Sequence, residues 1–294
     1  MSMVNNAHAG SSLVLLNLID RVLIRRGKPV ARSELLEILR PDLLPKSENG
    51  AKRFEWNLDF WLEEGLWPQD GLGQISAPAG ATEQNIAHRV LALLVDNLNS
   101  QSEQEILDGT RSEPFFRAMT CLLAQRRYVF MGGGTVSVSN VAEAVNSWLS
   151  GRGMNESNER STFLAYGEFL GFLEPFDKGY IVDPTLAIEP YLEKVFVDSS
   201  PLPIRVFIER LAEYLPMLDG GRYRLLLEPL MESWQPDDTY EISAALSHAL
   251  VRLESAFRLR LEKASDDSAS MRLQLPNGVL RLVGEIHYRA EVSI

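Results

Sequence analysis

From residue 54 to residue 67 the chain reads FEWNLDFWLEEGLW, and a polar stretch and the short segment QIS at residues 74–76 follow. The apolar residues Phe54, Leu58 and Trp61 recur at intervals of three or four, which predicts an amphipathic helix. Gly65 stops this helix, and the alternating residues after it predict a β-hairpin. The segment has the form of the last helix and the wing of a winged helix.

The residues before this segment complete the pattern. Apolar residues at helical spacing predict one helix over residues 11–26, capped by Ser11 or Ser12, and a second over residues 33–39. Helix, short strand, helix, helix and hairpin is the order of a winged helix, a form of helix-turn-helix unit.

The helix and hairpin pattern occurs twice more, at residues 163–182 and at residues 246–275, where the strands are expected to pair across the polar residues 264–269. Helix dominates elsewhere, and strand is confined to short hairpins. The fold class that the sequence predicts is therefore mainly α with short β-hairpins, in tandem winged-helix domains.

Proline, glycine and serine mark two domain boundaries, at residues 78–81 (PAGA) and 199–203 (SSPLP). They predict a winged-helix domain at residues 1–80, a helical linker with a second winged helix at residues 81–200, and a C-terminal winged-helix domain at residues 201–294. The run of three glycines at residues 132–134 is expected to be a turn, because no P-loop lysine follows it.

Charge is spread unevenly along the chain, whose net charge is −11. Residues 1–80 hold 9 basic and 10 acidic side chains (net −1), residues 81–240 hold 13 and 23 (net −10), and residues 241–294 hold 7 and 7 (net 0). A duplex is attracted by basic surfaces and repelled by acidic ones. The two ends could therefore contact DNA, whereas the acidic centre is suited to a basic protein partner.

Cationic side chains on the third helix and wing of the two end units are candidates for nucleic-acid or partner contact. The candidates are Lys46, Lys52, Arg53, His248, Arg252, Arg258, Arg260, Lys263 and Arg272. A solvated surface of mixed charge explains the same residues equally well. In the middle unit, Arg160 and Lys178 stand among many acidic residues, and no DNA contact is expected there.

Three tryptophans crowd the first unit. Trp61 continues the inner stripe of its helix and is expected in the core, whereas Trp56 lies off that stripe and Trp67 opens the wing. An exposed tryptophan at either of the last two positions would be a candidate contact residue.

No sequence motif indicates an enzyme. P-loop, zinc-protease, nucleophile-elbow and dinucleotide-binding patterns are all missing, and no catalytic residue, metal ligand or cofactor is predicted. The single cysteine, Cys121, excludes an internal disulfide and is expected to be buried. No signal peptide or membrane-spanning run is seen, so a cytoplasmic location and no membrane partner are expected.

The N-terminal unit (residues 13–66), the chain length and the closing helix LSHALVRLE at residues 246–254 with its wing together resemble the DpdG family. This family is an accessory component of bacterial gene clusters that put 7-deazaguanine derivatives into DNA and restrict unmodified DNA. The resemblance implies a role in DNA modification, restriction and antiviral defence among ATPase, helicase and nuclease partners, and it supplies no catalytic residues.

Two functions follow from these observations. The first is a non-enzymatic winged-helix adaptor or DNA-engaging subunit of a DNA modification and restriction system, with DNA contacts through the first and third units. The alternative is a winged-helix transcriptional regulator, which would bind a defined operator as a symmetric dimer.

Overall fold

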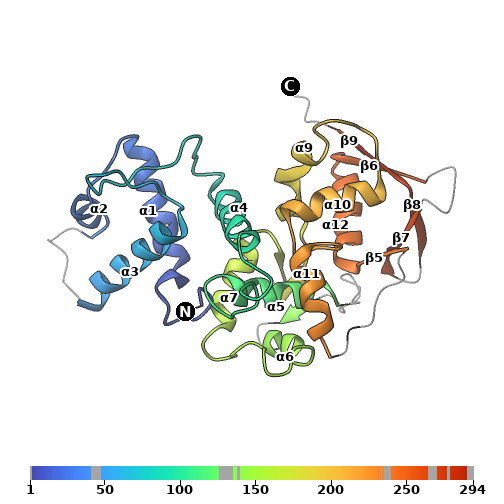
Figure 1. Cartoon of the computed structure of the whole chain (residues 1–294), viewed down its shortest axis with the longest axis horizontal. Helices are drawn as coiled ribbons and strands as arrows, with labels where there is room; N and C mark the ends of the chain where they lie inside the picture. Colours follow the sequence, from blue (N-terminus) through green and yellow to red (C-terminus); the bar gives the residue numbers. More distant parts are fainter. Residues whose placement is uncertain are drawn as a thin grey trace. The chain divides into compact units, whose positions relative to one another are not determined.

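A computed structural model describes residues 2–40, 48–125, 135–137, 140–232, 234, 240–263, 270–276 and 279–289. The described chain is mainly helical, with small sheets of short strands (Figure 1). It divides into an N-terminal unit, Met1–Pro114 with Ser161–Tyr166, and a C-terminal unit, Phe115–Arg160 with Gly167–Ile294. The predicted boundaries at residues 80 and 200 fall inside these units, and the division into three domains stays a prediction.

The N-terminal unit contains the predicted order of elements. The helices of this unit are η1 (Ala9–Ser11), α1 (Leu13–Arg26), α2 (Arg32–Leu39), α3 (Glu48–Glu64) and α4 (Ile86–Asn99). Val30, which lies between the helices α1 and α2, forms an antiparallel β-bridge with Ile75. Ile75 also forms an antiparallel β-bridge with Gln69, in the hairpin.

Local sequence signals set the ends of α1. The Ser12 hydroxyl accepts a hydrogen bond from the backbone N–H of Leu15 at 3.3 Å, which satisfies one of the free donors at the helix start. Gly27 ends the helix in the left-handed region at φ +60°, where a side chain would be strained. Both predicted ends of this helix are confirmed.

A buried polar cluster joins α1, α4 and the hairpin. The indole Nε1 of Trp67 donates to Asp20 Oδ1 at 2.9 Å, and Arg89 donates to Asp20 Oδ2 at 2.6 Å. Both Trp67 and Asp20 are buried. The carboxylate is therefore paired on both oxygens, as a buried charge requires. Trp61 is fully buried in the core, as its position on the helix predicts.

The remaining helices are mostly short. Proline interrupts two helical stretches, where Pro190 and Pro229 each lie in a 3-10 turn. The bounds are α5 (Glu113–Leu123), α6 (Val141–Asn146), α7 (Arg160–Phe169), α8 (Thr185–Ile188), η3 (Glu189–Tyr191), α9 (Leu192–Val195), α10 (Ile204–Tyr214), α11 (Arg222–Leu227), η4 (Glu228–Leu230) and α12 (Ala244–Ser255). Cys121, on α5, is buried as predicted.

The first sheet of the C-terminal unit has the order β1-β3-β2 and is antiparallel. Its strands are β1 (Thr135–Ser137), β2 (Leu173–Phe176) and β3 (Gly179–Val182). Asp177 and Lys178 form the turn between β2 and β3. The hairpin predicted for residues 163–182 is therefore confirmed. The predicted glycine turn at residues 132–134 lies outside the described residues.

Two further sheets hold the C-terminal strands. One has the order β4-β9-β6 and the other the order β5-β7-β8, in which β5 and β7 are parallel. The strands are β4 (Leu202–Pro203), β5 (Glu241–Ile242), β6 (Leu259–Glu262), β7 (Met271–Gln274), β8 (Leu280–Val283) and β9 (Glu285–Tyr288).

The pairing that the sequence predicts for the third hairpin is wrong. The sequence predicts that β6 and β7 pair across residues 264–269, which lie outside the described residues. Instead β6 pairs with β9, and β7 pairs with β8. Strands β6 and β7 have the same alternation of buried and exposed side chains, so the sequence pattern suits more than one partner. In the fold, the buried side chains of Leu259, Leu261 and Ile286 form one apolar face of the β6–β9 pair.

The helix predicted to read DNA in the third unit is a core helix. Residues 244–250 of α12 are all buried, and the helix packs against α8, β6 and β7. The first half of α12 therefore belongs to the core, and the contact with DNA that the sequence predicts for this helix stays a prediction. Among the described residues, every helix is too short or too polar to span a bilayer.

Candidate nucleic-acid interface

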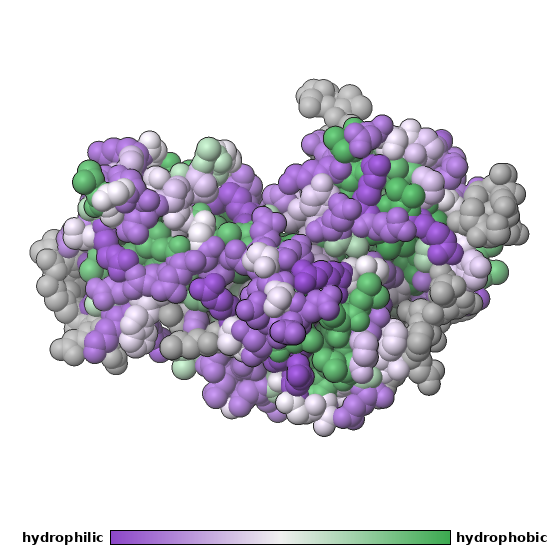
Figure 2. All heavy atoms as spheres, viewed as in Figure 1, coloured by the Kyte–Doolittle hydropathy of each residue, from purple (hydrophilic) through white to green (hydrophobic). Residues whose placement is uncertain are grey.

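A surface cavity of about 320 Å³ lies in the N-terminal unit, where the N-terminal segment and the start of α1 meet the first half of α3. We call it the α3 cavity. The visible face of this unit is largely hydrophilic, with small apolar patches (Figure 2). The cavity is lined by Asn6, Ala7, His8, Ser11, Ser12, Leu15, Lys52, Arg53 and Trp56.

The α3 side of the cavity carries two of the predicted contact residues. Lys52 and Arg53 are exposed, and no acidic side chain among the described residues lies within 4.0 Å of either cation. Trp56 lies one turn further on the same side of the helix and is 52% exposed. It is the exposed tryptophan that the sequence allowed at this position. Lys46, the third predicted cation here, lies outside the described residues.

The opposite side of the cavity presents a neutral imidazole. Nδ1 of His8 accepts a hydrogen bond from the backbone N–H of Gly10 at 3.1 Å, and the ring packs edge-on against Phe60 at 5.1 Å. Burial lowers the pKa of His8 below its ordinary value of 6.5. The ring is therefore neutral at pH 7, and because Nδ1 is an acceptor, Nε2 carries the proton and is a donor.

The N-terminal segment is fixed by contacts within its own unit. Tyr166 donates from its hydroxyl to the carbonyl of Gly10 at 2.6 Å, and Thr162 and Ser161 donate to the side-chain oxygen of Asn6. Gly10 also sits directly on Phe60, since a Cβ at this position would lie 2.3 Å from the ring. The cavity wall is therefore preformed.

Residue types around the α3 cavity suit a phosphate beside a flat ring. Cations and hydroxyl groups position nucleic-acid backbones, and exposed aromatic rings stack on bases. Sequence reasoning identifies Lys52, Arg53 and Trp56, but not His8 or Ser11. No local signal marks these two, because the cavity forms between segments about forty residues apart in the chain.

The C-terminal candidates lie in a different environment. His248 is only 3% exposed, and its Nε2 lies 3.5 Å from Asp183 Oδ2. Arg252 forms ion pairs with Asp183 and Glu174. Burial works to raise the pKa of Asp183, but hydrogen bonds from His248 and Thr185 outweigh it and lower this pKa to about 2. His248 and Arg252 therefore hold a buried carboxylate within the unit.

The other C-terminal arginines are also paired with acidic side chains of the same unit. Arg258 lies 3.1 Å from Glu189, and Arg260 lies 3.0 Å from Glu262. Arg272 pairs with Glu241 on the neighbouring strand, and Lys263 is exposed. Their charge is therefore partly offset inside the unit, and their predicted contacts with DNA or a partner stay predictions.

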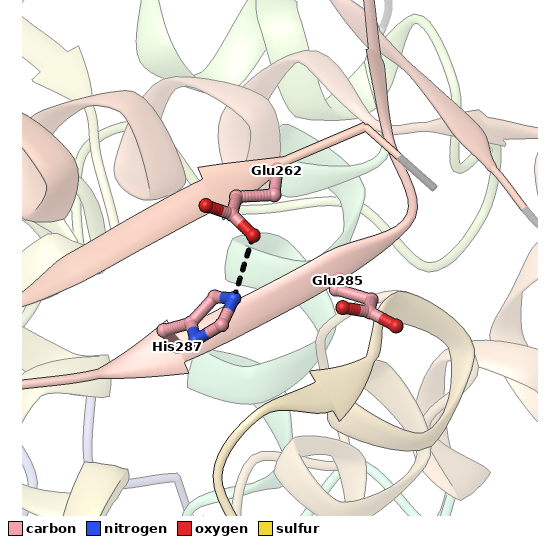
Figure 3. Close-up of side chains that lie close together, drawn as sticks. All are labelled: Glu262, Glu285 and His287. Carbon is pink, nitrogen blue, oxygen red and sulfur yellow. Dashed lines mark hydrogen bonds and ion pairs between the residues drawn. The ribbon is translucent and has the colours of Figure 1, made fainter. Parts of the chain in front are cut away.

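A second cluster lies on the outer face of the β6–β9 pair. Figure 3 shows Glu262 on one strand and Glu285 and His287 on the other, with potential ligand atoms within 4.8 Å of one another. The His287 Nε2 lies 2.9 Å from Glu262 Oε2. Arg260 lies 3.0 Å from Glu262 and 3.5 Å from the same imidazole nitrogen. A divalent cation would have to displace this guanidinium, so the cluster has the character of an ion-pair network.

Comparison with known proteins identifies the family. The family model described as DpdG-like matches residues 1–267, which is most of the chain. No curated protein and no solved structure matches the chain. The resemblance predicted from the sequence is thereby confirmed, and the family points to a role in the Dpd DNA modification system. The chain belongs to the DpdG-like family.

Proposed function

We propose that this protein is a non-enzymatic winged-helix adaptor that engages DNA within a bacterial DNA modification and restriction system, with a role in phage defence. Membership of the DpdG-like family supports the setting. The order of elements in the N-terminal unit supports the winged-helix assignment, in which α3 is the recognition helix.

The observation that carries the proposal is the contrast between the two sets of predicted cations. Lys52 and Arg53 on α3 have no acidic neighbour among the described residues, whereas Arg252 and Arg258 are tied to carboxylates. A cation that is paired with a carboxylate gains less binding free energy from a phosphate than an unpaired cation does, because the existing ion pair must first be broken. The N-terminal unit is therefore the part proposed to contact DNA.

The acidic middle of the sequence supports the second part of the proposal, which is that the protein acts as an adaptor. Residues 81–240 carry 13 basic and 23 acidic side chains, a net charge of −10. Such a segment repels a duplex and attracts a basic protein surface. The partners proposed are ATPase, helicase or nuclease subunits of the same system.

A pair of charge-removing variants tests the DNA contact. Lys52→Ala with Arg53→Ala removes two cations from α3, and Arg260→Ala with Lys263→Ala removes two from the C-terminal unit. Fluorescence anisotropy with a labelled duplex at low salt should show weaker binding for the α3 variant alone. Equal loss in both variants, or binding unchanged by the α3 variant, would contradict the proposal that the N-terminal unit is the part that contacts DNA.

A pulldown of the tagged full chain from its native host, read by mass spectrometry, tests the adaptor part. Recovery of an ATP-hydrolysing or nuclease partner is expected, and recovery of no partner would contradict it. Protection of one defined, two-fold symmetric operator in a footprinting assay would instead favour the alternative, a transcriptional regulator.

A further inference from the structure

We propose that the α3 cavity receives one unpaired nucleotide of a DNA strand, whose base stacks on Trp56 and whose phosphate is held by Lys52 and Arg53. The inference rests on the proposed function and deepens it. It adds a preference for unpaired over fully paired DNA, which the charge contrast alone does not give.

Trp56 is the first support for an unpaired base. Trp56 is 52% exposed, whereas Trp61 and Trp67 in the same unit are 0% and 2% exposed. A base inside a duplex has both faces covered by its neighbours, so an aromatic side chain can stack only on a base that is unpaired or extruded. Stacking on an aromatic ring also tolerates any base, since every base has a π face.

Size and charge are the second support. A volume of about 320 Å³ lies at the small end of ligand pockets, which suits a single nucleotide and excludes a duplex. Lys52 and Arg53 lie on the rim beside Trp56, and neither is neutralised by a described acidic side chain. A phosphate attached to the stacked base would therefore meet two cations that no described carboxylate neutralises.

Polar groups on the opposite wall provide contacts for the edge of the base. Nε2 of the neutral His8 is a donor, and the Ser11 hydroxyl, which donates to the His8 carbonyl at 2.7 Å, keeps its oxygen lone pairs as acceptors. Asn6 and Gly10 hold this wall in place through their bonds with Thr162 and Tyr166. A preformed wall lowers the entropy lost on binding.

The test compares three labelled DNA probes of one sequence by fluorescence anisotropy: a full duplex, the same duplex with one extrahelical base, and the single strand. The variants are Trp56→Ala, the conservative Trp56→Phe, and Phe257→Ala, which removes a 73% exposed aromatic ring from the C-terminal unit. Circular dichroism checks that each variant is folded.

We expect Trp56→Ala to weaken binding to the single strand and the bulged duplex by about 5- to 150-fold, the range of one stacked base. Binding to the full duplex should change less than about twofold, Trp56→Phe should keep most of the affinity, and Phe257→Ala should change nothing. If Trp56→Ala leaves single-strand affinity unchanged, or weakens all three probes equally, the inference is overturned.

Further measurements distinguish the failure of this inference from the failure of the proposed function, and a DNA strand from other anionic ligands. If Lys52→Ala with Arg53→Ala changes no DNA affinity at all, the proposed function itself fails. If duplex binding depends on these cations but no probe depends on Trp56, only the nucleotide site fails. Competition by a free mononucleotide or by a poly-glutamate peptide as strong as that by the single strand would also overturn the assignment to a DNA strand.

Discussion

Replacement of Asp183 by asparagine tests whether the predicted C-terminal contact residues serve the fold. This carboxylate is 4% exposed and follows directly after β3. It accepts a hydrogen bond from the backbone N–H of Thr185 at 2.9 Å and faces His248 and Arg252 on α12. Burial alone would raise its pKa, but the donors hold it at about 2, against an ordinary 3.8.

The pKa shift gives the magnitude. The folded pKa of about 2 lies well below the ordinary 3.8, and a difference of one in pKa corresponds to about 1.36 kcal/mol, so ionised Asp183 contributes about 2 kcal/mol to stability. Because the folded pKa lies below the ordinary value, this contribution is complete above pH 3.8 and is lost as the pH falls from 3.8 towards 2. Asp183→Asn should therefore lower the free energy of unfolding by about 2 kcal/mol at pH 7.

Urea unfolding followed by circular dichroism at pH 7, 5 and 3 measures the effect. The difference between the wild-type protein and Asp183→Asn should be the same at pH 7 and 5 and smaller at pH 3. Arg260→Ala is the control, since its exposed ion pair is worth less than about 1 kcal/mol. A difference below about 0.5 kcal/mol at pH 7, or one that does not change with pH, would refute the reasoning.

Three other predictions concern the two units. Arg224→Ala should destabilise the protein by about 3–5 kcal/mol in urea unfolding, because it leaves the buried carboxylate of Glu228 without its guanidinium partner and also removes the ion pair with Asp219. Trp67→Phe removes the donor to buried Asp20 and should cost about 1–3 kcal/mol in the same assay. The lowered pKa of His8 means that its part of the stability is complete above pH 6.5 and is lost as the pH falls below it. Thermal unfolding between pH 7.5 and 5 should therefore show a decline that His8→Asn, whose amide oxygen replaces the acceptor for the N–H of Gly10, reduces.

Elements that depend on neighbouring residues could be predicted from the sequence. Ser12 caps the start of α1 and Gly27 ends it, both through contacts with residues close in the sequence. The β2–β3 hairpin closes over a two-residue turn. The cost of closing such short loops is small, so local patterns decide the structure.

Elements that depend on distant residues could not be predicted. Strand β6 pairs with β9, where Ile286 lies on the same apolar face as Leu259 and Leu261, although β7 has the same alternation of buried and exposed residues as β6. His287 likewise lies beside Glu262 only because β6 and β9 pair, so the sequence alone does not indicate this contact. Short strands of similar composition leave several pairings open until tertiary packing selects one.

The candidate site divides in the same way. Helical spacing places Lys52, Arg53 and Trp56 on one side of α3, and that much follows from the sequence. Whether a cation is free or paired does not, because its acidic neighbour can come from any part of the chain. Arg252 and Lys52 look alike in the sequence, and only the fold shows that the former faces Asp183.

The salt dependence of DNA affinity tests most directly the claim that α3 of the N-terminal unit engages DNA. Each phosphate neutralised contributes about −0.9 to the slope of log affinity against log salt for a duplex. Lys52→Ala with Arg53→Ala should therefore make the slope shallower by about 1.8, whereas Arg260→Ala with Lys263→Ala should leave it unchanged. An unchanged slope for the α3 variant, or an equal change for both variants, would contradict the account.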